Sequence, residues 1–163
     1  MSRRIVTELA ANFTRIHGFY LQFIDECPEA LWTKKSGGWP LWQHIVHVYG
    51  CIDHFVRQEG QQPVPYPCKV DNIVALEFAA DAMVDKATMR AYMLTLKATG
   101  DAYIDGLIDA QLGDKNVGYS ARRKHGAGDC SHALTLSMLA AHGYYHFSIL
   151  DAALREHGCK GIY

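Results

Sequence analysis

Two histidines, His142 and His146, occur four residues apart in the segment LTLSMLAAHGYYHFSILDAALRE. This segment predicts one long helix, and residues four apart on a helix lie on the same face, one turn from each other. Two imidazole rings so placed can reach a single metal ion. A third ligand from elsewhere would leave one coordination position open, as in catalytic zinc sites. The pair could also be two half-buried histidines that only pack and hydrogen-bond, so a third histidine is needed to favour the metal interpretation.

A second segment, GWPLWQHIVHVYGCIDHFVRQEG, offers that third ligand. It also predicts a helix, because Pro40 suits a first helical position and Gly60 suits a helix end. Its apolar residues recur at helical spacing: Leu41, Ile45, Val48, Ile52, Phe55 and Val56. Beside them runs a polar stripe: His44, His47, Cys51 and His54. One member of this stripe could point into a site shared with His142 and His146, or the stripe could be a histidine-rich helix edge.

Four long helices are expected to position these side chains. They run roughly over Ser2–Cys27, over Pro40–Glu59, from Thr88 to about Ile108, and from Asp129 or Ser131 to Gly158. In the first helix, the apolar positions with a period near 3.6 are Ile5, Leu9, Phe13, Ile16, Tyr20 and Phe23. Few stretches alternate in polarity, so strands should be scarce. The pattern predicts an all-α fold, a four-helix bundle.

Three connecting segments complete this prediction. The segment QQPVPYPCKV, with three prolines, predicts an extended crossover between the second and third long helices. Such a crossover allows these two helices to be other than antiparallel neighbours. A short helix is expected in DNIVALEFAAD, with Asp71 as its N-cap. The segment GDKNVGYSARRKHGAGDC predicts a glycine-rich, basic loop.

Composition limits the class of partner. The chain has 163 residues, which suits a single domain over residues 1–163, and 49% of them are hydrophobic. The formal net charge of −1 argues against a general nucleic-acid or anionic-membrane binder. No segment reaches the roughly 18 uncharged apolar residues of a membrane-spanning helix. We therefore expect a small-molecule partner, with no nucleic acid and no membrane.

The cysteines indicate a reducing compartment. They are odd in number, scattered, and form no C-x-x-C pair: Cys27, Cys51, Cys68, Cys130 and Cys159. The first segment, MSRRIVTELAANFTR, contains polar residues that break any apolar signal core, so we expect a cytoplasmic protein. Cys51 lies one turn beyond His47 and could approach a metal, or it could be a small buried residue.

Two segments, GWPLWQHIVHV and AAHGYYHFSIL, resemble the DinB-like (YfiT-like) superfamily of metalloenzymes. Its members share a four-helix bundle and a histidine triad, with one ligand from the second helix and an H-x-x-x-H pair from the last. In the family pattern, a tryptophan-led helix start precedes the first ligand by about two turns. The resemblance therefore implies a metal site of His47, His142 and His146.

The chain departs from the family pattern at two places. Pro40 stands where a serine or threonine usually caps the second helix. Phe147 and Ser148 replace the Gly-Gln pair that often follows the last histidine. These departures concern local details and leave the three histidines in place.

The ligand set and the resemblance together imply a class of chemistry. Three neutral imidazoles suit zinc or nickel first, with iron or cobalt as alternatives, and they suit Mg²⁺ or Ca²⁺ poorly. A bound cation could activate water, which gives a hydrolase, or deprotonate a thiol, which gives a transferase. Characterised members of the resembled family include thiol-dependent transferases and isomerases. The resemblance thus implies a transferase that uses a low-molecular-weight thiol on a small electrophilic substrate.

Two alternatives stay open at this point. One is a metal-dependent hydrolase. The other is a non-catalytic module that binds a small ligand or a metal, for example as a homodimer. The residues identify no general acid or base, because no carboxylate stands at a telling spacing from the histidines.

Overall fold

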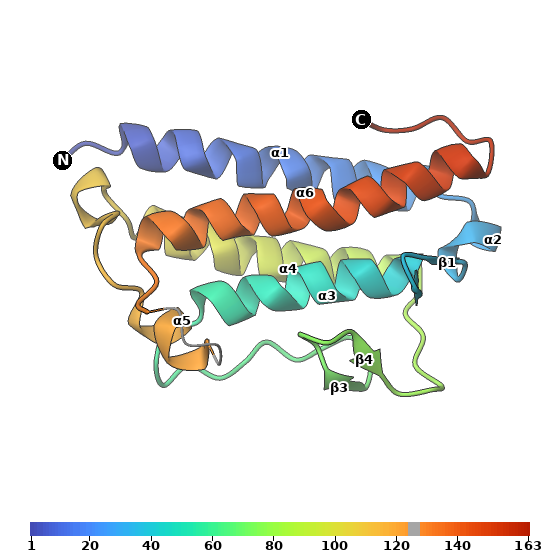
Figure 1. Ribbon diagram of the computed structural model, residues 1–163, viewed down its shortest axis with the longest axis horizontal. Helices are drawn as coiled ribbons and strands as arrows, with labels where there is room; N and C mark the ends of the chain where they lie inside the picture. Colours follow the sequence, from blue (N-terminus) through green and yellow to red (C-terminus); the bar gives the residue numbers. More distant parts are fainter. Residues whose placement is uncertain (124–127) are drawn as a thin grey trace.

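The computed structural model describes residues 1–123 and 128–163 and is predominantly helical (Figure 1). The long helices are α1 (Arg4–Glu26), α3 (Leu41–Val56), α4 (Lys86–Asp105) and α6 (His132–Glu156). The short ones are α2 (Glu29–Trp32), the 3₁₀ turn η1 (Asp109–Gln111) and α5 (Val117–Arg122). Two antiparallel hairpins pair β1 (Lys35–Ser36) with β2 (Trp39–Pro40), and β3 (Val70–Asn72) with β4 (Glu77–Phe78). The predicted all-α class is confirmed.

The four long helices lie side by side (Figure 1). Helix α1 packs against α4 and α6, and α3 packs against the same two helices. Helices α3 and α4 run in the same direction, opposite to α1 and α6 (Figure 1). Because α3 and α4 are consecutive and parallel, the chain has to return along the length of α3 between them. The proline-rich residues 61–66, which form neither helix nor strand, lie in this return connection as predicted.

One buried network fixes the relative position of α3 and α6 at one end. The side-chain amide of Asn116 is fully buried and donates to the Phe55 carbonyl and to Thr135 Oγ1, at 3.0 Å each. Phe55 lies in the last turn of α3 and Thr135 in the first turn of α6. Asn116 also caps α5, since its Oδ1 accepts from the Tyr119 backbone N–H.

The buried stripe of α1 begins one residue later than expected. Ile5 is 52% exposed, whereas Val6 is fully buried. Val6 lies two turns before Phe13, so it shares the inward face, and Ile5 is rotated from it by about 100°. The assignment of Ile5 to the core was therefore wrong.

The segment predicted as a short helix after the prolines is the β3–β4 hairpin, so that prediction was wrong. Asn72 Oδ1 accepts hydrogen bonds from the backbone N–H groups of Val74 and Ala75. Leu76 then adopts a positive φ of 53°. Such local side-chain bonds give the backbone an alternative to the helix, and Asp71 is a strand residue rather than an N-cap.

Part of the segment predicted as a basic loop is instead helical, because it forms α5. Residues 124–127 of that loop lie outside the described residues. Within the described ranges, no helix is long and apolar enough to cross a membrane. The five cysteines are unpaired thiols.

Candidate metal centre

Three histidines meet where α3 packs against α6. His47 comes from the middle of α3, and His142 and His146 come from the middle of α6. The four-residue spacing predicted the pair on α6, and the family resemblance implied His47. One nitrogen of each ring lies within 4.8 Å of the others, and the Nε2 atoms of His47 and His142 are 2.9 Å apart. Among the residues that the structure describes, these three form a group able to hold a metal ion.

The spacing of these nitrogens fits one transition-metal ion. Two nitrogens bound to the same zinc at about 2.0–2.1 Å each can be at most about 4.2 Å apart. The Nε2 atoms of His47 and His142, 2.9 Å apart, meet this limit. Small side-chain rotations that move the nitrogens by a few tenths of an ångström bring the third nitrogen within it. The donor set of nitrogens, with no oxygen ligand, suits zinc, nickel, cobalt or iron.

Burial keeps the three rings neutral, which is the form that binds metal. His47 and His146 are 5% and 6% exposed, and His142 is half-buried. Loss of hydration, together with repulsion from the neighbouring histidines, lowers the pKa of His142 to about 4 and that of His146 to about 3. Burial also lowers the pKa of His47.

A backbone carbonyl selects the tautomer of His47. Its Nδ1 lies 2.6 Å from the Ile73 carbonyl oxygen, in the turn between β3 and β4. A carbonyl only accepts, so Nδ1 carries the ring proton and Nε2 keeps its lone pair. That lone pair faces His142 and accepts a hydrogen bond from the ring of His142. An outer partner of this kind is typical of histidines that bind metal.

Gly50 allows the Ile73 carbonyl to come this close. A Cβ atom at Gly50 would lie 2.8 Å from Ile73 Cγ1 and 3.0 Å from the Tyr66 ring. Both distances are shorter than a normal contact, so a side chain at position 50 would push the turn away from α3. The hydrogen bond to His47 therefore depends on this glycine.

His44 lies beside the triad although the family pattern does not make it a ligand. It is fully buried, its Nδ1 is 3.0 Å from His146 Nδ1, and its Nε2 is 2.9 Å from the Ser36 carbonyl oxygen. His54, the other alternative in the stripe, packs instead against Phe55 and Tyr119.

Cys51 fits its interpretation as a small buried residue. Its Sγ lies 3.9 Å from Nδ1 of His47, on the edge that bonds Ile73 and not on the Nε2 edge. Burial raises the pKa of this thiol to about 12, so it stays protonated at neutral pH. A protonated thiol is a poor ligand and a poor nucleophile.

Aromatic rings surround the histidines. Phe55 meets His142 edge-on with ring centres 5.7 Å apart, and the exposed Tyr145 meets His146 at 5.0 Å. Of the three tryptophans, Trp39 lies edge-on to His44. Trp32 and Trp42 are buried in the core.

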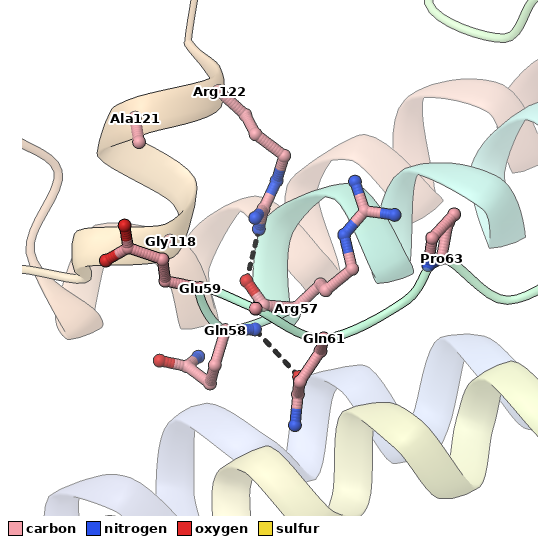
Figure 2. A pocket seen from close by; sticks show the side chains of 9 residues that line it. Arg57, Gln58, Glu59, Gln61, Pro63, Gly118, Ala121 and Arg122 are labelled. Atoms are coloured by element: carbon pink, nitrogen blue, oxygen red, sulfur yellow. Dashed lines mark hydrogen bonds between the residues drawn. The ribbon is translucent and has the colours of Figure 1, made fainter.

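The basic residue Arg122 stabilises the end of α3 and does not face the histidines. Figure 2 shows a surface pocket of about 370 Å³ between the end of α3 and α5, where Arg122 points at the Arg57 carbonyl. Its guanidinium also donates to the His54 carbonyl, and Arg57 pairs with Asp53. Arg122 thus satisfies two carbonyls that the end of α3 leaves without partners. The pocket contains none of the triad residues.

Three groups beside the triad were not given a role from the sequence, for different reasons. The Ile73 and Ser36 carbonyls belong to the backbone, so no residue type signals them. His44 did carry a signal, since it precedes His47 by three residues on the same helix. That offset placed His44 near the face of His47, and the structure places it against His146.

Comparison with models of protein families, with curated proteins and with solved structures found no match.

Replacing Gly50 with alanine should weaken metal binding about 10-fold, because the displaced Ile73 carbonyl no longer orients His47. It should also destabilise the fold by about 1–3 kcal/mol through overpacking. Gly18→Ala is the matched control, since Gly18 is in α1 with nothing within 4 Å. That change should leave metal affinity unaltered. Chelator competition and urea denaturation measure both effects, and unchanged affinity in Gly50→Ala would contradict the role of the carbonyl.

Acidification should destabilise the metal-free protein. Folding lowers the pKa of His142 from 6.5 to about 4 and that of His146 to about 3, so the unfolded chain binds more protons over this range. Stability should therefore rise with pH from about 4 to 6.5 and level off above. A tenfold change in proton affinity is worth about 1.4 kcal/mol, so the loss on acidification to pH 4 should be on the order of 3 kcal/mol for each of the two histidines.

Urea denaturation across this pH range, in the presence of a chelator, measures the effect. His146→Phe should flatten the pH dependence, because it removes one buried histidine and its repulsion on the others. The exposed His157 provides the control, and His157→Gln should keep the wild-type slope. Identical slopes in wild type and His146→Phe would show that the cluster does not cause the loss.

Proposed function

We propose that this protein is a metal-dependent enzyme of the DinB-like superfamily, with His47, His142 and His146 as its metal ligands. In this proposal the four long helices form that family's four-helix bundle, and the ion is zinc or nickel, with iron or cobalt as alternatives. One observation carries it: three neutral imidazoles from α3 and α6 converge, with two Nε2 atoms 2.9 Å apart. Three protein ligands leave one position of a tetrahedral ion free.

The reaction that we propose is transfer of a low-molecular-weight thiol to a small electrophilic substrate. A bound divalent cation stabilises a thiolate more than a thiol, which is the chemistry that such a transferase requires. His142 is the most exposed of the three ligands, so thiol and substrate approach from its side, past the ring of Phe55. The thiol would lose its proton to water, and its sulfur would form the new bond to the electrophilic carbon as the bond from that carbon to a leaving group breaks. The leaving group would depart with the electron pair of the broken bond.

The charges around the histidines support an anionic ligand at the open position. The groups that shift the pKa values of His47, His142 and His146 by charge are other histidines. All of these are neutral near pH 7, so a loaded site would carry the positive charge of the ion. A thiolate would partly neutralise that charge, which a neutral ligand cannot do.

Removing one ligand should abolish metal binding. The wild type should hold about one equivalent of zinc or nickel, and His47→Ala and His142→Ala should each lower the affinity more than about 100-fold, since they remove direct ligands. His54→Ala is the matched control, because His54 lies on the same helix but packs against Tyr119. Elemental analysis and chelator competition measure occupancy. Equal occupancy in wild type and His142→Ala would refute the site.

Thiols should change the spectrum of the cobalt-substituted protein. If a thiolate binds at the open position, a panel of cellular thiols should produce an intense sulfur-to-cobalt charge-transfer band. The S-methyl derivatives of the same thiols are the control, because they cannot form thiolates, and they should produce no band. Absence of a band with every thiol would count against the transferase.

The other outcomes of this assay identify the alternatives. Metal-dependent cleavage of ester or amide substrates without thiol would indicate a hydrolase. Bound metal with neither thiol binding nor hydrolysis would indicate a non-catalytic binding module.

A further inference from the structure

A fourth histidine uses both of its ring nitrogens next to the triad. His44 is fully buried, with its Nε2 2.9 Å from the Ser36 carbonyl oxygen and its Nδ1 3.0 Å from His146 Nδ1. The ring is fully buried and its two partners, a carbonyl and an imidazole, provide no counter-ion, so it is neutral and carries a single proton. A buried polar side chain needs partners for both nitrogens, and His44 has them.

The position of the single proton follows from these partners. The Ser36 carbonyl can only accept, so the proton of His44 is on Nε2 and Nδ1 has a lone pair. The bond between the two Nδ1 atoms then requires that His146 donate, so the proton of His146 is on its Nδ1. A neutral imidazole has one proton, and Nε2 of His146 therefore keeps a free lone pair.

The β1–β2 hairpin holds His44 in place. Gly37 and Gly38 form its turn with φ of 59° and 96°, and a Cβ atom at Gly37 would lie 3.7 Å from His44 Cε1. The ring of Trp39, from β2, meets the His44 ring edge-on at 6.0 Å. The hairpin thus supplies both the hydrogen-bond acceptor and part of the enclosure.

We infer that His44 is a positioning residue of the metal centre: with the Ser36 carbonyl, it holds His146 in the tautomer whose Nε2 binds metal. This inference rests on the proposed function, because it assumes that His146 is a ligand. It makes the β1–β2 hairpin part of the site, just as Ile73 brings in the β3–β4 hairpin. Outer partners of ligand histidines commonly change metal affinity 10–100-fold.

Two substitutions separate this role from simple packing. His44→Leu keeps an apolar side chain in the core but provides no acceptor for His146. His44→Asn places an amide oxygen near the position of Nδ1, so it can still accept from His146 while losing the bond to Ser36. His17→Leu is the matched control, since His17 is also buried and hydrogen-bonded, to Tyr49, but lies outside the site.

The first measurement needs no metal. Nitrogen-15 NMR of the metal-free wild type should show His146 protonated on Nδ1. His44→Leu should shift His146 toward the Nε2-protonated tautomer, and His44→Asn and His17→Leu should not. A wild-type His146 protonated on Nε2, or no change in His44→Leu, would overturn the inference whether or not the protein binds metal.

The second measurement is chelator competition with zinc or cobalt. His44→Leu should bind about 10–100-fold more weakly than wild type, with an altered cobalt spectrum, while His44→Asn and His17→Leu should stay close to wild type. Equal affinity in wild type and His44→Leu would overturn the positioning role. Failure of the wild type itself to bind metal would instead refute the proposed function. The NMR experiment tests the tautomer of His146 separately, because it needs no metal.

Discussion

Several imidazole rings have to stay uncharged together at one buried contact, between α3 and α6. The elements around this contact are arranged so that the rings can remain neutral. Protonating any ring would place a charge in a poorly hydrated site beside other imidazoles, so burial and mutual repulsion both lower the pKa values. A neutral ring has one donor and one lone pair. If the lone pair is to face the shared centre, the proton on the other nitrogen needs an acceptor behind it.

Such acceptors cannot easily come from the long helices, whose interior carbonyls already accept hydrogen bonds within the helix. Here they come from the two hairpins, through Ser36 before α3 and Ile73 after it. This gives the return connection between α3 and α4 a second role. It reverses the chain direction so that the two helices can be parallel, and it also brings the Ile73 carbonyl to His47.

The parts of this arrangement differ in how far the sequence predicts them. Helical periodicity located the four long helices, and the four-residue spacing placed His142 and His146 on one face, because both signals depend on side-chain type. In α1 the prediction failed at Ile5 alone, since Ile5 and Val6 are both apolar and only packing distinguishes them. The β3–β4 hairpin was missed because Asn72 competes locally for the backbone in a segment whose composition also suits a helix. The carbonyls of Ser36 and Ile73 leave no trace in the residue types at all.

The choice of outer partners also bears on the ligand that the proposed centre would take. Metal-binding histidines often have a carboxylate behind them, which adds negative charge and makes the ring a stronger donor. Here the partners are a carbonyl oxygen and the neutral ring of His44. A divalent ion held by three neutral rings with neutral partners would keep more of its charge at the open position than one backed by carboxylates. Because the site is buried, that charge is poorly screened, and binding of an anion such as a thiolate is favoured over binding of a neutral molecule. The outer partners of the proposed centre therefore favour an anionic ligand.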